Sequence, residues 1–154
     1  MKTAQSTKKL VKKLHEHVRV VAFGTFDILH PGHLHYLTSA KKLGNELIVG
    51  IARDTTVQKL KGKLPANNED TRLQMVAALR VVDKAVLGNK GPIYDILEEI
   101  KPGVIALGYD QHVDTEKLVR ELEARKLKCK VIRLDAFSPE KFKSSRIKEK
   151  IRAQ

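Results

Sequence analysis

Two histidines, His30 and His33, stand three residues apart and flank a Pro-Gly pair in the segment GTFDILHPGH, residues 24–33. Histidines with this spacing can handle phosphate, bind a metal ion or pack in a core. A metal site needs three or four ligands, but the neighbouring candidates are only Asp27 and His35, which falls on a different helical face from His33. Core histidines are mostly isolated ones. The pattern therefore favours a phosphate site over a metal site.

Pro31 and Gly32 predict a tight turn that leads into a helix with His33 in its first turn. Proline presets φ for the first corner of such a turn, and glycine tolerates a positive φ at the second. The free N–H groups and the positive dipole end of a helix N-terminus bind phosphate. Gly24 and Gly32 are expected to let a ligand approach the backbone closely.

The elements that must position these residues alternate between strand and helix. Continuous β-branched apolar runs predict strands at residues 18–23, 46–52, 82–88, 104–108 and 129–134. Helical patterns occupy residues 33–44, 67–79, 91–100, 114–126 and 144–152. We expect Gly44 to cap the first helix at its C-terminus, and a hydroxyl of Ser144 or Ser145 to cap the start of the last.

This alternation predicts one α/β domain over residues 18–154, a doubly wound, Rossmann-like fold on a five-stranded parallel sheet. Residues 1–17 are expected to form a basic N-terminal tail or helix. Ligands of such sheets bind beyond the carboxyl ends of the strands, where the strand order reverses. Neither of the nucleotide-binding motifs G-x-x-x-x-G-K-[ST] and G-x-G-x-x-G follows the first strand. A phosphate site at this edge would therefore bind phosphate without either of these loops.

The composition of the 154-residue chain is that of a globular protein, with 42% hydrophobic and 31% charged residues. Its apolar runs are far shorter than the roughly 20 residues of a membrane-spanning helix, so we expect no membrane partner. No secretory signal is visible, and Cys129 is the only cysteine. A reduced, cytoplasmic setting fits these features best.

A net charge of +12 attracts polyanions, so a nucleic-acid-binding module is an alternative of another class. Such a module needs basic residues interleaved with exposed aromatic side chains. The chain has three Tyr, four Phe and no Trp. Because several of these aromatics fall in the predicted strands and helices, the sequence argues against a nucleic-acid partner.

The segment GTFDILHPGH resembles the G-T/S-F-D-x-x-H-x-G-H signature of the nucleotidyltransferase α/β-phosphodiesterase superfamily, and the resemblance extends from residue 18 to about residue 150. Its cytidylyltransferase-like branch includes glycerol-3-phosphate cytidylyltransferases and archaeal FAD synthases. The resemblance implies transfer of a nucleotidyl group from a nucleoside triphosphate to a phosphate acceptor, with release of pyrophosphate and no covalent enzyme intermediate. It also implies a homodimer, and Mg²⁺ carried with the triphosphate rather than held by a protein metal site.

By this resemblance His30 and His33 hold the α-phosphate and stabilise the transition state, while Thr25 and Phe26 contact the nucleotide together with Pro31 and Gly32. The family also uses lysines of the loop after the second strand to neutralise phosphates. Lys61 matches best there and Lys59 next, on a stretch that we expect to be extended or mobile. Arg72 could face the same anion or form a surface salt bridge.

Two further nucleotide contacts are implied near the C-terminal half of the chain. Asp110 follows the fourth strand and could bind a ribose hydroxyl or a base amino group, or else cap the turn after Gly108. The segment FKSSRIK matches the family's I-S-S-T-x-I-R motif in part, with Lys143 in place of the first serine. The resemblance assigns phosphate binding to Ser144, Ser145 and Arg146.

The longer loop LDAFSPEKFK and the segments ARDTTVQKLKGKLP and IALGYDQHVD look more like archaeal FAD synthases than glycerol-3-phosphate cytidylyltransferases. The tryptophan that the latter carry is missing. The prediction is therefore transfer of AMP from ATP to FMN. The alternative is transfer of CMP from CTP to glycerol 3-phosphate or another small phosphorylated alcohol. Phe137 in the longer loop could stack on a base or a flavin ring, or belong to a local core.

Overall fold

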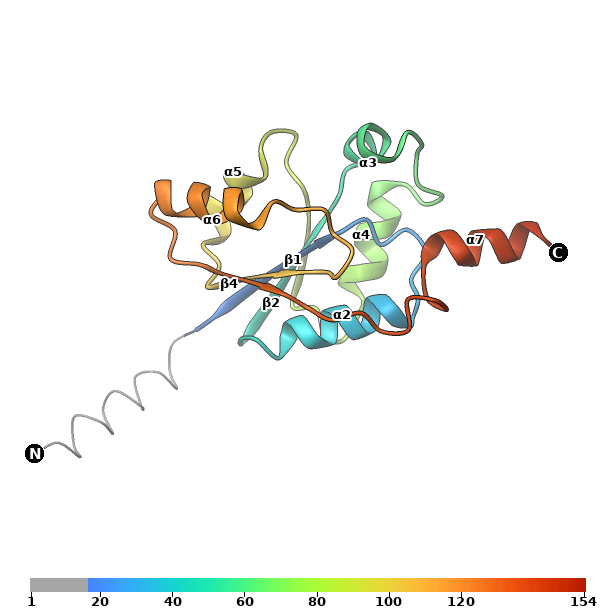
Figure 1. Ribbon diagram of the computed structural model, residues 1–154, viewed down its shortest axis with the longest axis horizontal. Helices are drawn as coiled ribbons and strands as arrows, with labels where there is room; N and C mark the ends of the chain where they lie inside the picture. Colours follow the sequence, from blue (N-terminus) through green and yellow to red (C-terminus); the bar gives the residue numbers. More distant parts are fainter. Residues whose placement is uncertain (1–16) are drawn as a thin grey trace, which may run out of the picture.

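The computed structural model describes residues 17–154 of the chain, and the predicted basic tail therefore lies outside the described residues except for His17. The strands are β1 Arg19–Gly24, β2 Glu46–Ile51, β3 Lys84–Leu87, β4 Val104–Leu107 and β5 Lys130–Arg133. The helices of the described part are α2 Pro31–Lys41, α3 Asp54–Lys61, α4 Glu69–Ala77, α5 Ile93–Ile100, α6 Thr115–Ala124 and α7 Ser144–Arg152. All five predicted strands are present, and Figure 1 shows their order in space.

The strands form one five-stranded sheet with the order β3-β2-β1-β4-β5, and every pair is parallel. This confirms the predicted fold class. Alternate residues of β1 point to opposite faces: Val20 and Ala22 pack in one apolar core, and Val21 packs in the other. Helices α2 and α4 cover the first face, and α5 and α6 cover the second (Figure 1). Burial on both faces explains the continuous apolar runs in the sequence.

The strand order reverses at β1, which lies between β2 and β4. The connections from β1 and from β4 leave the sheet toward opposite faces, so a crevice opens between the loops that follow these two strands. The loop after β1 contains the histidine motif, and the loop after β4 contains Asp110. No helix within residues 17–154 has the length and apolarity to cross a membrane.

Two local predictions about the ends of α2 are wrong. Pro31 and Gly32 are the first residues of α2 rather than a tight turn, because His30 already caps the helix. Gly44 does not cap that helix, which ends in a right-handed residue, Lys42. Glycine is needed at position 44 for space instead, since a Cβ there would lie 2.5 Å from the carbonyl oxygen of Val18.

The stretch predicted to be extended after β2 is instead the helix α3. Val57 is buried and anchors it, and its first turn is held by mutual hydrogen bonds between Asp54 and Glu69. The helix ends at Gly62, whose φ of +72° gives the left-handed C-terminal cap that glycine favours. Our sequence prediction missed this helix because its one buried apolar residue leaves a weak periodic pattern.

Arg72 of α4 is completely buried, which contradicts both the surface salt bridge and the direct anion contact expected for it. Its guanidinium donates to the carbonyl oxygens of Thr25 and Ala52, each at 2.7 Å, and to that of Asn67 at 3.0 Å. It also pairs with Asp54 at 2.7 Å. Arg72 therefore connects the residue that follows β1 to the residue that follows β2 through buried hydrogen bonds.

We predict that Arg72→Met lowers the free energy of unfolding by about 3–5 kcal/mol, because it leaves Asp54 and three carbonyl oxygens without their buried partner. Urea denaturation followed by circular dichroism measures this change. The matched control is Arg120→Met on α6, an exposed arginine, which should change stability by less than about 0.5 kcal/mol. Equal stability of the two variants would contradict the structural role of Arg72.

Candidate active site

The loop after β1 ends with His30 at the N-terminus of α2. His30 is the N-cap residue in an extended conformation, and its Nδ1 accepts a hydrogen bond from the amide of Gly32 at 3.1 Å. Proline at the first helical position loses no hydrogen bond, because the first amides of a helix have no partner within it. A Cβ on Gly32 would lie 2.9 Å from the His30 ring, so glycine is required there. A neutral His30 then carries its proton on Nε2, where it can be donated to a ligand.

His33 lies one turn further, and its ring stacks on that of His30 with 3.8 Å between the ring centroids. The edge of Phe26 contacts His33 from another side, with centroids 5.2 Å apart. The Nδ1 atom of His33 is buried and has no hydrogen-bond partner within the described residues. Buried polar atoms nearly always have partners, so this atom is an exception that the contacts of the described residues do not explain.

The electrostatic surroundings keep the two imidazoles neutral. Burial, the neighbouring His30 and the ammonium of Lys61 together lower the pKa of His33 from 6.5 to about 4. Burial also lowers the pKa of His30, although the carboxylate of Asp110 opposes this effect. His30 and His33 at the start of α2 thus lie near Lys61 at the end of α3 and Asp110 in the loop after β4. The two imidazoles are neutral hydrogen-bond donors, and the exposed ammonium of Lys61 is a cation close to them.

Phe26 lies beneath the histidines and is only 2% exposed. Its φ of +53° is left-handed, a strained conformation for a bulky residue. Its ring stacks on Tyr36, whose hydroxyl donates to the carbonyl oxygen of Ala106 at 2.9 Å. A Cβ on Gly24 would meet the Phe26 ring at 2.7 Å, so Gly24 makes room for this ring rather than for a ligand. The side chain of Phe26 is a support for the histidines, which leaves its backbone for any nucleotide contact.

Asp27 is a functional residue that our sequence analysis did not assign. Its carboxylate accepts hydrogen bonds from the amides of Ala66 and Asn67, each at 2.9 Å, and from the ammonium of Lys148. Burial alone would raise the pKa of Asp27, but these hydrogen bonds outweigh it and lower the pKa. Asp27 thus joins the loop after β1 to the segment before α4 and to α7. The signal available in the sequence was its fixed place in the G-T-F-D part of the motif.

The start of α7 lies against the start of α2. Ser144 donates its hydroxyl to the carbonyl oxygen of Ile28 at 3.2 Å, so it does not cap the helix as predicted. The N-cap residue is Lys143, which makes no side-chain capping bond. Ser145 and Arg146 are exposed in the first turn. The free amides of this turn therefore offer a second anion-binding end beside the histidines.

Lys143 also connects α7 to the loop after β4. Its ammonium lies 3.9 Å from the carboxylate of Asp110 and 5.6 Å from the ring centroid of Tyr109. Asp110 therefore faces a side chain of α7 across the crevice. Any ribose or base that enters between these two loops meets this pair.

The side chains of the two lysines of α3 point in different directions. Lys59 and Lys61 are two residues apart on a helix, which turns the side chains about 200° from each other. Lys61 is the one whose charge acts on His33. We expected both lysines to face one anion because we expected this stretch to be extended. Since the stretch is a helix, the reason for that expectation no longer holds.

Phe137 lies at the surface with 43% of its area exposed, so it does not belong to a local core. Its ring stacks on His35 at 5.0 Å between centroids. On the other side lies Phe142, 5.9 Å away and parallel within 1°. These three rings form an aromatic stack next to the start of α7.

We predict that acidification destabilises the protein through His33 between about pH 6.5 and about pH 4. The pKa of His33 is lower in the folded than in the unfolded chain, so the unfolded chain binds more protons in this range. Stability is fully present above pH 6.5 and falls by up to about 1.4 kcal/mol per pH unit as the pH decreases. Urea denaturation at several pH values measures the slope. His33→Gln should reduce it, whereas an unchanged slope in that variant would exclude His33 as its source.

Comparison with known proteins agrees with this geometry. The cytidylyltransferase-like family model matches residues 21–150. A FAD synthase of Aciduliprofundum boonei is 48% identical over 129 residues, which cover 84% of this chain and 86% of that protein. A FAD synthase of Methanosarcina mazei is 55% identical over 117 residues, which cover 75% of this chain and 76% of that protein. A FAD synthase of Pyrococcus horikoshii is 46% identical over 136 residues, which cover 87% of this chain and 92% of that protein.

Solved structures show the same fold. A protein of Thermoplasma volcanium, described as a lipopolysaccharide core biosynthesis protein, superposes with a TM-score of 0.76 at 43% identity. The match covers 79% of this chain and 98% of that one. A pantoate-β-alanine ligase of Francisella tularensis, 15% identical with a TM-score of 0.54, shares the fold alone. Sequence and structure together show that the chain belongs to the cytidylyltransferase-like family.

Proposed function

We propose that this protein transfers AMP from ATP to FMN and produces FAD and pyrophosphate. The observation that carries the proposal is the stacked pair of His30 and His33 at the N-terminus of α2, beyond the carboxyl end of β1. The relatives described above are FAD synthases, and this chain matches most of their length. We also propose, as the family resemblance implies, that the enzyme is a homodimer of the cytoplasm.

The reaction that suits this site is a direct displacement at the α-phosphorus of ATP. A phosphate oxygen of FMN forms the new bond to that phosphorus while the bond to the bridging oxygen breaks, and pyrophosphate carries the electron pair away. Neutral His30 and His33 donate hydrogen bonds to α-phosphate oxygens, and Lys61 offsets the charge that gathers on them. No side chain needs to form a covalent bond.

The β- and γ-phosphates suit the start of α7. The free amides there, the hydroxyl of Ser145 and the guanidinium of Arg146 are donors for phosphate oxygens. The hydroxyl of Ser144 would join them only by giving up its hydrogen bond to Ile28. We propose that Asp110 accepts a hydrogen bond from a ribose hydroxyl or from the adenine amino group. Thr25 lies where the loop after β1 begins, with its carbonyl oxygen already held by Arg72.

Mg²⁺ would be carried by the triphosphate, whose negative charge it would partly neutralise. In residues 17–154 there is no group of three or more His, Cys, Asp or Glu side chains that could hold a metal ion. The donors of the crevice are imidazoles, amides, hydroxyls and cations, which fit a phosphate chain rather than a hard cation.

Phe137 supports an aromatic ligand. Its ring stacks on His35 and Phe142, and 43% of its area is exposed. A flat adenine or flavin ring can extend this stack at little cost in conformational entropy, because the partners are already ordered. We therefore retain Phe137 as a substrate-binding residue.

The proposal is tested by combining ATP or CTP with FMN, glycerol 3-phosphate or phosphoethanolamine in the presence of Mg²⁺. Pyrophosphate release and chromatography of the products identify the reaction. FAD formed only from ATP and FMN supports the proposal. Product from CTP and a small phosphorylated alcohol would assign the chain to the alternative activity, and no product from any pair would contradict both.

We predict that His30→Ala and His33→Ala each lower kcat by several orders of magnitude, since each removes a donor to the transition state. The measurement is steady-state FAD synthesis, with circular dichroism to confirm the fold. His17→Ala is the matched control, because His17 pairs with Glu46 at the opposite end of β1. Near-normal turnover in either crevice variant would rule out its phosphate role.

Lys61→Ala should lower kcat/KM by about 100-fold through loss of charge stabilisation. Lys59→Ala is the comparison on the same helix, and its effect should be much smaller because that side chain points away from Lys61. Both variants keep α3 intact, since alanine is the best helix former. Equal losses in the two variants would show that general positive charge near the crevice matters rather than one directed ammonium.

A further inference from the structure

The two strands that border the crevice stop pairing with each other before they end. Their last paired residues are Ala22 of β1 and Ala106 of β4. Beyond this pair β1 continues to Gly24 and β4 to Leu107, and the crevice opens between the loops that follow them. Backbone groups at the floor of the crevice therefore need partners other than the neighbouring strand.

Gln111, in the loop after β4, supplies such a partner to both strands. Its side-chain nitrogen donates to the carbonyl oxygen of Phe23 in β1. Its side-chain oxygen accepts from the amide of Gly108, the residue after β4, at 3.0 Å. One amide side chain thus bridges β1 and the loop after β4 at the point where the two strands separate.

The same carbonyl oxygen connects Gln111 to the histidine motif. The carbonyl oxygen of Phe23 also accepts from the hydroxyl of Tyr36 at 3.3 Å. The ring of Tyr36 stacks on that of Phe26, and the edge of Phe26 contacts His33. A continuous series of contacts between ordered side chains therefore leads from Gln111 to the ring of His33.

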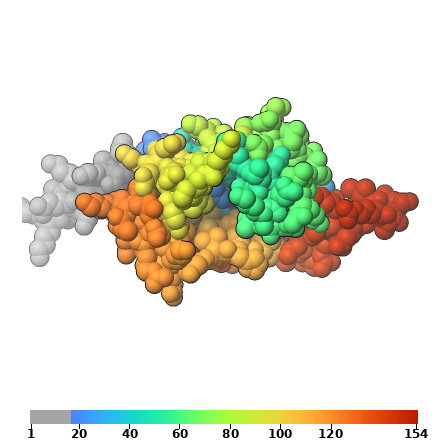
Figure 2. All heavy atoms as spheres, turned by 90° about the horizontal axis from the view of Figure 1, so that it is seen from above, coloured from blue at the N-terminus to red at the C-terminus, as the bar shows by residue number. Residues whose placement is uncertain are grey.

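The loop that Gln111 binds carries the candidate contacts to the nucleoside. Tyr109 and Asp110 are exposed, and Figure 2 shows light-orange atoms of this part of the chain at the surface. Arg133, the last residue of β5, binds the loop from another side. Its guanidinium donates to the carbonyl oxygen of Gly108 at 2.8 Å and to that of Gln111 at 2.9 Å. The protein's own side chains thus fix this loop on two sides.

We propose that Gln111 is a positioning residue for the nucleoside part of the nucleotide. A nucleotide with its phosphates on the histidines meets Asp110 only while the loop after β4 keeps its place relative to β1. Gln111 sets that place because it binds both. The inference rests on the proposed function in one respect, that the crevice binds a nucleoside triphosphate, and it does not require FMN as the acceptor.

Gln111→Met tests the proposal, because it keeps an unbranched side chain of similar length and removes both hydrogen bonds. Isothermal titration calorimetry of the full chain measures the dissociation constants of ATP and of inorganic tripolyphosphate, each with Mg²⁺. The constant for ATP should rise about 10-fold or more, since ordering the loop then costs part of the binding free energy. The constant for tripolyphosphate, which has no nucleoside, should change by less than about 2-fold.

A second variant, Arg133→Met, keeps the proposal testable if Gln111→Met does not fold. Arg133 is exposed, so its replacement spares the core, and it releases the same loop. This variant should also weaken the binding of ATP and leave that of tripolyphosphate nearly unchanged.

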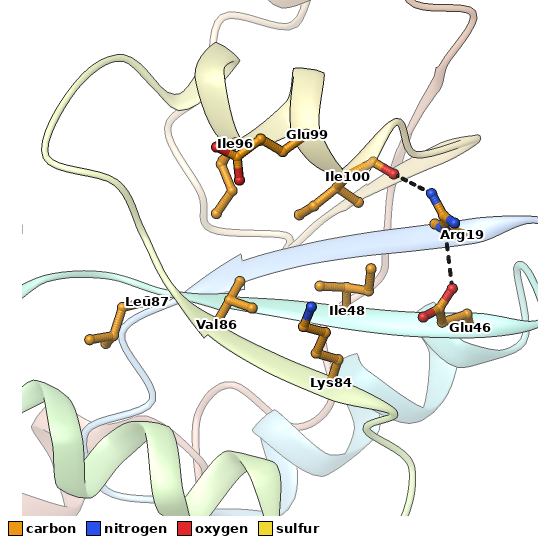
Figure 3. Close-up of a pocket in the computed structure, with 9 residues that line it drawn as sticks. All are labelled: Arg19, Glu46, Ile48, Lys84, Val86, Leu87, Ile96, Glu99 and Ile100. Atoms are coloured by element: carbon orange, nitrogen blue, oxygen red, sulfur yellow. Dashed lines mark hydrogen bonds and ion pairs between the residues drawn. The ribbon is translucent and has the colours of Figure 1, made fainter.

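Each variant has a matched control. Gln74→Met, at an exposed position of α4, is the control for Gln111→Met. Arg19→Met is the control for Arg133→Met, because it removes the same charge and a similar bond. Arg19 donates to the carbonyl oxygen of Ile100 at 2.8 Å, at the opposite end of β1 from the crevice (Figure 3). Both controls should leave the two dissociation constants unchanged.

The proposal is overturned if Gln111→Met leaves the affinity for ATP unchanged. It is also overturned if that variant weakens ATP and tripolyphosphate equally, since the residue would then support the whole site rather than the nucleoside loop, or if Arg19→Met weakens ATP as much as Arg133→Met does. An unchanged chain that binds ATP but forms no FAD would contradict the proposed function alone. One that binds ATP no more tightly than tripolyphosphate would contradict the role of Gln111.

Discussion

The hydrogen bonds of Asp27 are the contacts on which the crevice depends most. One carboxylate binds the amides of Ala66 and Asn67 and the ammonium of Lys148, and so holds three segments that are distant in sequence. These hydrogen bonds to a charged acceptor are stronger than neutral ones, which outweighs the cost of burying the charge. With Asp27 in place, the loop that carries His30 has one conformation, and the start of α7 lies against it.

Arg72 complements Asp27 on the lower side of the same loop. Its guanidinium occupies the space beneath the ends of β1 and β2 and binds carbonyl oxygens that have no strand partner there. The loop after β1 is therefore held in two ways. The buried carboxylate of its own Asp27 binds other segments, and the buried guanidinium of Arg72 binds the backbone carbonyl of Thr25. Such support allows the left-handed backbone of Phe26 and the neutral, partly unpartnered histidines to persist without a ligand. The site is preorganised, which is what charge stabilisation without covalent catalysis requires.

The sequence by itself determined the parallel α/β fold, all five strands and the position of the histidine motif at a helix N-terminus, because runs of apolar residues and the H-x-G-H spacing are local signals. Our sequence analysis missed α3, which is only eight residues long and buries one side chain, Val57. Nor could it show that Arg72 is buried, that Lys59 and Lys61 diverge, or that Asp27 joins three segments. Those facts depend on which segments meet across the sheet. Only the tertiary structure decides this, because a side chain's partners there are set by packing between elements rather than by its neighbours along the chain.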